Sequence, residues 1–171
     1  DHCLSRGLGD VYKRQASPYT ESQLYEVGFT QSADVMYLVH EDVAPRKLSR
    51  TGHTSWTLTE VDFKRGPYLD QNTTSTTMTP NGTSGSVTIT ASSNTFVSTD
   101  VGRLIKFSGG HAKITNFSSA TQVTATTTDN FSGTGGTTDW SLGTFTSTKG
   151  FPRAVSFFEQ RLVFAGTTSF L

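Results

Sequence analysis

Short apolar runs that alternate with polar residues recur along this chain, and this alternation constrains the fold more than any other feature. In GSVTITAS (85–92), Val87 and Ile89 alternate with Thr88 and Thr90. A period of two places apolar side chains on one face of a β-strand and polar side chains on the other. Thr and Phe suit a pleated surface, whereas Gly and Ser mark turns. We therefore expect an all-β fold.

The first part of the chain contains four runs of strand length. They lie around Tyr25–Phe29 and at 34–40, 46–50 and 55–63. Thr20 and Gln23 have the spacing of a capping box, which suggests one helical turn before the first run. EDVAP (41–45) is expected to be a turn, since Pro45 cannot donate to a strand ladder. A break in the alternation near Glu60 suggests a β-bulge. Four consecutive strands predict an antiparallel meander resembling one β-propeller blade.

The composition changes after Gly66-Pro67. From about residue 73 the chain is rich in Thr, Ser and Gly, yet alternation continues in DVGRLIKFSG (100–109) and TDWSLGTF (138–145). HAKITNFSSATQVTATTT (111–128) is predicted to be a hairpin with SSAT as its turn. These patterns indicate a small Thr-rich β domain rather than a disordered segment.

The last run, VSFFEQRLVFAG (155–166), loosely repeats VGFTQSADVMYLV (27–39). We expect a strand, an EQ turn and a second strand, which would begin another blade. The expected organisation is therefore a meander at 16–72, an inserted Thr-rich domain at 73–148 and the start of the next blade at 149–171. One blade and part of another cannot close a propeller, so we interpret the chain as a fragment of a larger protein.

Charge and cysteine content favour no particular partner. Charged residues make up 16% of the 171 residues and the formal net charge is zero, whereas average soluble domains contain about 25% charged residues. Affinity for nucleic acid based on phosphate neutralisation is not indicated. No apolar run approaches the roughly 20 residues that span a bilayer, and no signal peptide is evident. Cys3 has no partner for a disulfide within one chain.

Serines, glycines, histidines and carboxylates that could support chemistry have simpler structural interpretations. GTSGS (82–86) lacks the spacing of a nucleophile elbow and is interpreted as a turn. The glycine-rich stretches 108–110 and 133–136 precede no helix that could hold a phosphate and are expected to be hairpin turns. His40 beside Glu41 and Asp42 is interpreted as a solvated strand end. Glu60 with Asp62 is interpreted as an exposed strand face, and Asp100 as a turn residue.

The remaining polar candidates also favour structural roles. Arg161 is expected to bind turn carbonyls or Glu159 across its hairpin. A solvated face is preferred to a weak nucleic-acid contact for the basic set Arg46, Lys47, Arg50, Lys64 and Arg65. Four N-x-[ST] sequences are expected by chance in a chain this rich in Ser and Thr: Asn72, Asn81, Asn116 and Asn130. We therefore predict no catalytic, cofactor-binding or metal-binding residue, and no enzyme.

Two stretches, 17–72 and 150–168, resemble a family of phage tail proteins, the nozzle or tail tubular protein B of short-tailed phages. The matching residues are Gln31, Asp34, Pro45, Leu48, Arg50, Trp56, Gly66, Pro67, Tyr68, Pro152, Phe157, Arg161 and Leu162. The Thr-rich middle follows the family only in outline, through GSVTIT, VGRLIKF and TQVTAT.

The resemblance implies a structural protein of the virion tail with a propeller-like β body and inserted β domains. It implies a homo-hexameric ring, assembled in the host cytoplasm with other tail proteins, through which DNA passes transiently during exit. No cofactor and no membrane contact are implied. The near-zero net charge is compatible with a channel in which DNA slides.

Two other function classes stay open at this point. A carbohydrate-binding or receptor-binding β module of a virion would gather exposed aromatic residues on one face, for which Tyr19, Tyr25, Trp56 and Trp140 are candidates. A fragment of a β-propeller glycoside hydrolase would contain a facing pair of carboxylates.

The first fifteen residues, DHCLSRGLGDVYKRQ, resemble translated adapter sequence. The similarity to tail proteins begins directly after them, near Ser17. We therefore expect residues 1–15 to be a non-native, disordered leader in which Cys3 has no role.

Overall fold

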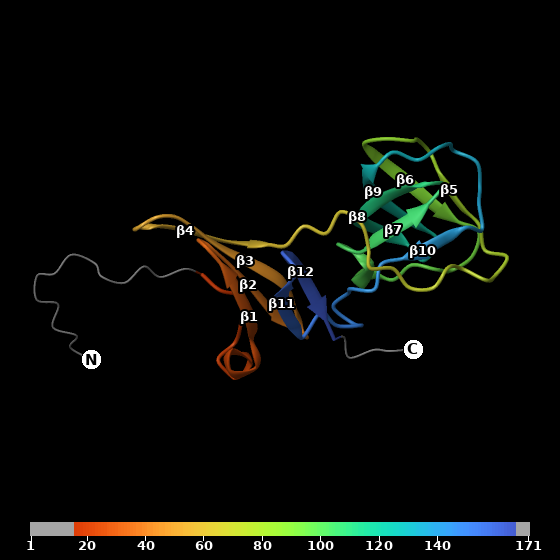
Figure 1. Cartoon of the computed structure of the whole chain (residues 1–171). Helices are drawn as coiled ribbons and strands as arrows, with labels where there is room; N and C mark the ends of the chain where they lie inside the picture. The colour runs from red at the N-terminus through yellow and green to blue at the C-terminus, as the bar shows by residue number, and fades with distance from the viewer. Residues whose placement is uncertain (1–15, 167–171) are drawn as a thin grey trace, which may run out of the picture. The chain divides into compact units, whose positions relative to one another are not determined.

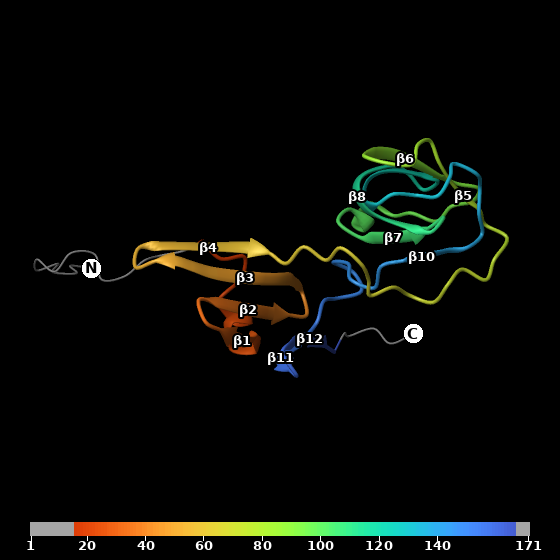
Figure 2. The ribbon, with the colours of Figure 1, turned by 45° about the horizontal axis from the view of Figure 1, so that its top comes forward.

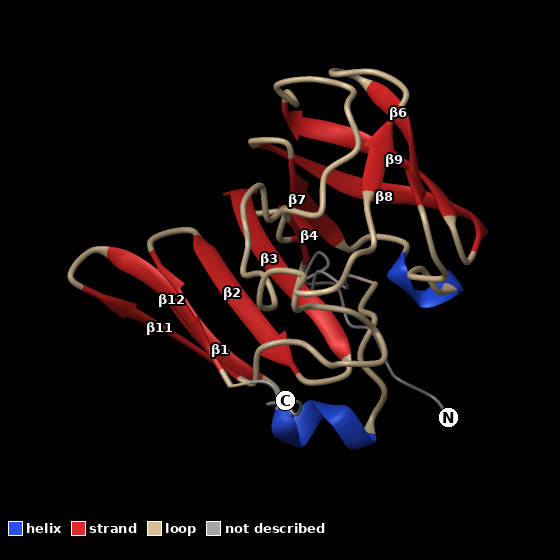
Figure 3. Cartoon of the chain, turned by 90° about the vertical axis from the view of Figure 1, so that its right-hand side faces the viewer, coloured by secondary structure: helices blue, strands red, loops and turns tan. Residues whose placement is uncertain are grey.

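Residues 16–166 are described by a computed structural model, and nearly all of their regular structure is β-strand (Figures 1 and 3). Two short 3-10 helices, η1 (Ser22–Glu26) and η2 (Ser98–Asp100), are the only helices in this range. All paired strands within it are antiparallel. The predicted all-β antiparallel fold is therefore confirmed. The predictions for residues 1–15 lie outside the described residues.

The described chain forms two compact units. The meander unit consists of residues 16–61 and 152–166, and the Thr-rich unit consists of residues 62–151. The second unit is thus inserted between two parts of the first. Phe63 and Phe151, near the two ends of the insertion, both lie against Phe145, with ring centroids 5.3 and 6.4 Å apart. The entering and leaving segments therefore meet within the Thr-rich unit.

The meander unit contains a four-stranded sheet in sequential order. Its strands are β1 (Gly28–Ser32), β2 (Val35–His40), β3 (Val43–Gly52) and β4 (Ser55–Glu60). Met36, Leu48 and Leu58 are opposite one another on three neighbouring strands, so they share one face. Tyr37, one residue after Met36, is on the other face. The predicted four-stranded meander is confirmed.

Two local predictions in this sheet are wrong. Pro45 lies inside β3 rather than in a turn, because the β2–β3 register shifts between Leu38 and His40 and leaves Pro45 in the irregularity. Proline is tolerated at such a bulge because no ladder hydrogen bond is required of its nitrogen. The expected bulge near Glu60 is absent from β4, which ends at that residue. The expected helical turn is present as η1, and the Thr20 N–H donates to Gln23 Oε1 at 3.0 Å.

A two-stranded hairpin lies against β1 and β2 of this sheet (Figure 2). It consists of β11 (Ala154–Phe158) and β12 (Arg161–Ala165). The ring of Phe157 meets that of Tyr37 edge to face, with centroids 6.2 Å apart. Glu159 and Gln160 form the turn with φ angles of 45° and 62°, which are typical of a tight hairpin. The EQ turn was predicted, and β11 lies beside β1, the first strand of the meander.

The Thr-rich unit contains a six-stranded sheet in the order β10-β7-β8-β9-β6-β5. The strands are β5 (Met78–Pro80), β6 (Ser86–Ala91), β7 (Leu104–Phe107), β8 (Gly110–Ser119), β9 (Gln122–Asp129) and β10 (Trp140–Leu142). Thr137 bridges to Met78 at the β5 edge, and the chain then continues into β10 at the opposite edge. The sheet is therefore curled into part of a barrel (Figure 1).

The apolar residues that alternate with polar residues along these strands fill the interior of the curled sheet. Ile89 is opposite Val123 and Val87 is opposite Ala125 on β6 and β9, and all four are buried. Phe107 and Phe131 pack with ring centroids 4.2 Å apart. The predicted hairpin is formed by β8 and β9, and Ala120 and Thr121 make its turn.

Candidate functional site

Residues 62–72, which we call the strap, connect β4 to the Thr-rich unit and lie along strand β10. The Leu69 N–H donates to Leu142 O and the Asn72 N–H donates to Trp140 O, each at 2.8 Å. The Thr144 N–H donates to Pro67 O at 3.0 Å. These bonds continue the curled sheet beyond its β10 edge. The strap also holds a group of ionisable side chains that contact one another and the neighbouring strands, and it is the candidate site.

A bidentate ion pair holds the strap to the end of β9. Arg65 Nε donates to Asp129 Oδ2 at 2.7 Å, and Arg65 Nη2 donates to Asp129 Oδ1 at 2.8 Å. The hydrogen bond from Arg65 lowers the pKa of Asp129. The Thr128 hydroxyl donates to Lys64 O at 3.1 Å. Two planar groups matched in this way fix orientation as well as distance.

A second polar contact joins the strap to β8. Tyr68 Oη lies 2.6 Å from His111 Nδ1, and the two rings are stacked with centroids 5.5 Å apart. Burial raises the pKa of Tyr68, so its hydroxyl stays protonated near neutral pH and donates. Burial also lowers the pKa of His111. The neutral imidazole then accepts at Nδ1 and keeps its own proton on Nε2.

A hydroxyl beside an imidazole is the arrangement that activates nucleophiles in many enzymes. Activation needs a hydroxyl that readily loses its proton, whereas burial makes Tyr68 harder to ionise. The same contact attaches the strap to β8, and Tyr68 also forms a backbone bridge with Gly143. The geometry therefore supports a fastening role for this pair. Sequence reasoning missed it because Tyr68 and His111 are far apart in the chain and neither belongs to a motif.

The basic residues predicted as one solvated face belong to both units. Arg46, Lys47 and Arg50 lie in β3, whereas Lys64 and Arg65 lie in the strap. Most of them approach a carboxylate. The pairs are Arg46 with Glu60 at 3.9 Å, Arg50 with Asp34 at 3.1 Å, Lys64 with Asp62 at 2.6 Å and Arg65 with Asp129 at 2.7 Å. Because these carboxylates neutralise most of the basic set, the contacts argue against a basic surface for binding nucleic acid.

The prediction that Glu60 and Asp62 share a strand face is wrong. Asp62 lies beyond the end of β4 and belongs to the Thr-rich unit. Its carboxylate contacts Lys64, and Lys113 of β8 approaches it at 3.7 Å. The hydrogen bond from Lys64 lowers the pKa of Asp62. Glu60 instead contacts Arg46 on the neighbouring strand of the meander.

His40 is not a solvated strand end, as the sequence had suggested, because its side chain is 1% exposed. Tyr19 and η1 fold back over it: the Tyr19 ring is edge-on at 6.4 Å and Glu26 Oε2 lies 3.5 Å from Nε2. The Asp42 N–H donates to His40 Nδ1 at 3.1 Å. Alternation places His40 in a strand but does not reveal the segment that covers it.

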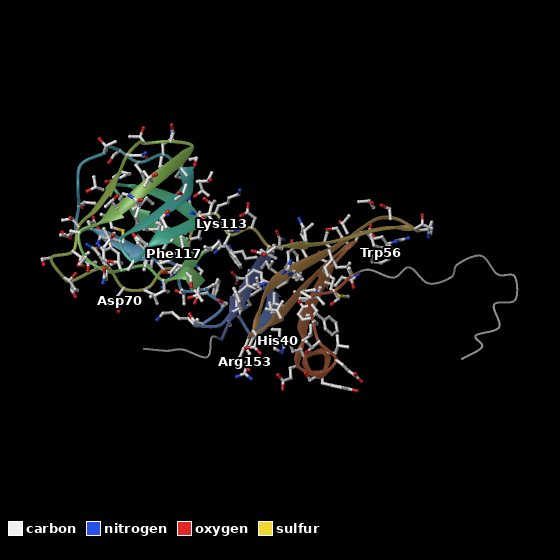
Figure 4. The ribbon with its side chains drawn as sticks, turned by 180° about the vertical axis from the view of Figure 1, so that it is seen from behind. His40, Trp56, Asp70, Lys113, Phe117 and Arg153 are labelled. Carbon is white, nitrogen blue, oxygen red and sulfur yellow. The ribbon has the colours of Figure 1, made fainter. Side chains whose placement is uncertain are left out.

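Several polar atoms around His40 are buried without a hydrogen-bond partner in the described part of the chain. They are Tyr19 Oη, His40 Nε2, Glu41 Oε2 and Arg46 Nε. Burial raises the pKa of Tyr19, and the charge of Arg46 opposes this effect. Arg153 Nε lies 3.2 Å from Glu41 Oε2, and Figure 4 shows Arg153 and His40 at the same end of the meander unit.

A buried ion pair lies at η2, where the sequence predicted only a turn residue. Asp100 and Arg103 are 2% and 6% exposed. Arg103 Nη1 donates to Asp100 Oδ1 at 2.8 Å and Arg103 Nε donates to Gly143 O at 2.6 Å. The Val97 N–H donates to Asp100 Oδ2. This pair ties η2 to the segment after β10, and its spacing of three residues is a signal that the sequence did contain.

The serine- and glycine-rich candidates lie in connections between strands. Residues 82–85 precede β6, Ser86 is its first residue, and Gly85 adopts a positive φ of 73°. Ser108 and Gly109 form the tight turn between β7 and β8, as predicted for that stretch. The expected hairpin turn at 133–136 is wrong, because β9 pairs with β6 and β8 and this stretch leads across to β10.

The aromatic candidates do not form one platform. Trp140 packs against the core of the Thr-rich unit and its indole N–H donates to Thr76 O at 2.9 Å. Trp56 lies under Arg50 in the meander unit, and Tyr19 covers His40. Of these four aromatic residues, only Tyr25 is strongly exposed, at 92%.

The predicted contact between Arg161 and Glu159 is absent from the described hairpin, where Arg161 lies opposite Phe158.

Within residues 16–166, no group of three or more His, Asp or Glu side chains is arranged to hold a metal ion. This part of the chain also contains no helix of the length and apolar character needed to cross a membrane. Comparison of the sequence with protein-family models finds no matching family, and comparison with curated proteins finds no match.

Proposed function

We propose that this chain is part of a structural protein of a phage tail, similar to the nozzle or tail tubular protein B of short-tailed phages. In the complete protein it would contribute to a ring through which DNA leaves the virion. The chain would supply one blade-like meander, an inserted Thr-rich domain and the hairpin that begins a second blade.

This proposal rests mainly on one observation: several of the residues shared with the tail-protein family lie together at one end of the meander. Asp34, in the β1–β2 turn, accepts from Arg50 Nη1 of β3 at 3.1 Å, and the Asp34 carbonyl accepts from the Arg50 N–H at 2.8 Å. The Arg50 guanidinium lies over the ring of Trp56 in β4. Gln31 Nε2 donates to Ala33 O in the same β1–β2 turn. The shared residues thus fix one end of the meander, which is a structural role.

The arrangement of layers supports the same proposal. The first strand of the hairpin, β11, packs beside the first strand of the meander, β1, and not beside its last strand. Successive blades of a propeller stack in this order around a common axis. In the sequence, the Thr-rich unit, whose two ends meet at Phe145, is inserted between β4 and β11. Within residues 16–166, no assembled aromatic platform or facing carboxylate pair favours a carbohydrate-binding or hydrolytic role.

Electron microscopy of the product of the complete reading frame tests the proposal. We expect six-fold rings with a central channel, and we expect portal and capsid genes near the gene. A monodisperse monomer without rings would contradict the proposal. Binding to a glycan array, or release of sugars from polysaccharides, would instead support one of the alternatives.

A further inference from the structure

In the first half of the strap (residues 62–68), Arg65 and Tyr68 are held by the side chains of Asp129 and His111. Pro67 O in the same half accepts from the Thr144 N–H. In the second half (residues 69–72), Leu69 and Asn72 are held by backbone bonds to β10, and the Asn72 side chain also donates to Thr138 O. The attachment of the first half therefore depends in part on side chains whose charge or hydrogen-bonding capacity changes with pH.

Burial is the main effect that opposes a positive charge on the His111 ring and lowers its pKa, and the charge of Asp129 acts in the opposite direction. Lys106 of β7 is directly opposite His111 in the sheet register, and Arg65 of the strap is close enough to repel an imidazolium. Asp129 of β9 is the one carboxylate facing it, and both Asp129 oxygens already accept from Arg65. Tyr68, the remaining facing group, is neutral and donates to Nδ1.

We propose that Tyr68 and His111 form an acid-labile clasp that holds the first half of the strap on the Thr-rich unit. A proton taken up from water at Nδ1 removes the acceptor that the Tyr68 hydroxyl uses. The imidazolium is then partly buried between cations, and it reaches water by turning away from Tyr68. The clasp opens, while the backbone bonds of Leu69 and Asn72 keep the second half of the strap in place.

The direction of the pH effect follows from the lowered pKa of His111. A group whose pKa is lower in the closed state than its ordinary value of 6.5 favours closure when it is neutral. The clasp is therefore fully effective above about pH 6.5, and its contribution is lost as the pH falls through the lowered pKa. Since the strap is where the chain enters the Thr-rich unit, acidification loosens that entry without unfolding the curled sheet.

Hydrogen exchange of the full chain at pH 7.5 and pH 5.0, corrected for intrinsic exchange rates, tests the clasp. In the wild type we expect the Thr144 amide, which donates to Pro67 O of the strap, to open about fivefold more often at the lower pH, the factor that one ordinary hydrogen bond supplies. Amides of β6 and β9 should keep their protection at both values. Equal protection of the Thr144 amide at the two pH values would overturn the proposal.

Three variants separate the clasp from a general effect of acid. His111→Gln cannot titrate, so its Thr144 amide should show no pH response, and a retained response would refute the role of His111. Tyr68→Phe keeps the ring but loses the hydroxyl, so its Thr144 amide should open about fivefold more often already at pH 7.5; unchanged opening would refute the hydrogen bond as the fastening. His53→Gln, in the β3–β4 turn of the other unit, is the matched control and should behave as the wild type.

Discussion

At the scale of single residues, the described chain contains both exposed ion pairs, which water screens, and a buried ion pair, which water does not screen. Lys64 and Asp62 are close but exposed, and such pairs contribute about 0–1 kcal/mol. Asp100 and Arg103 are almost fully buried and share their remaining hydrogen-bonding groups with the backbone. A buried pair is not strongly stabilising in itself, but removing one partner leaves the other charge buried without a counterion, which is strongly destabilising.

Replacing Arg103 with Met should therefore be strongly destabilising. Asp100 would keep its bond from the Val97 N–H and lose its cationic partner, and Gly143 O would lose its donor. We expect the free energy of unfolding to fall by about 3–5 kcal/mol, measured by urea denaturation. Lys64→Met, which removes an exposed partner in the same unit, is the control and should change it by less than about 1 kcal/mol. Similar small effects of both variants would show that the Asp100 charge is well solvated.

At the scale of elements, the β7–β8 hairpin depends on close backbone packing after its turn. A Cβ on Gly110 would lie 2.5 Å from Asn130 O and 2.7 Å from Asp129 O, so a side chain cannot enter without moving the end of β9. Gly133, in the following connection, has no heavy atom within 4 Å of such a Cβ. The two glycines therefore differ in the room that each has for a side chain.

Gly110→Ala should destabilise the Thr-rich unit by about 1–3 kcal/mol, the usual cost of overpacking. Gly133→Ala should change its stability by less than about 1 kcal/mol, because a methyl group there meets open space. Thermal unfolding followed by circular dichroism measures both. If Gly110→Ala left the thermal stability unchanged, the end of β9 would have to move aside without a loss of stability, which would contradict the prediction.

The elements also show what alternation can and cannot predict. It located β6 and β9 well, because each strand has apolar residues on one buried face and its period is visible in a few residues. It also located β11, whose alternating Val155 and Phe157 are not fully buried. It failed at Pro45, where a register shift in the partner strand makes room for a residue that normally ends strands. It also missed Tyr68 with His111 and Tyr19 with His40, since contacts between distant segments follow from tertiary packing and leave no local period.

At the scale of the whole molecule, the two units differ in how completely they bury their apolar residues. Among the described hydrophobic residues that are fully buried, Val39 is the only one in the meander unit, and the rest belong to the Thr-rich unit. Phe29 and Phe158, by contrast, are 65% and 67% exposed. A sheet with so small a core gains too little from burial to offset its conformational entropy.

This contrast predicts that the Thr-rich unit folds alone and the meander unit does not. Residues 62–151 expressed by themselves should unfold cooperatively on heating, since their core and both of their ends are contained within the unit. Residues 16–61 joined to 152–166 by a short Gly-Ser linker should lack a cooperative transition and bind a hydrophobic dye, because their apolar faces stay uncovered. Calorimetry and dye fluorescence measure the two outcomes. A cooperative transition in the linked meander unit would show that its sheet and hairpin form a sufficient core, and would remove the reason to expect further β layers around it.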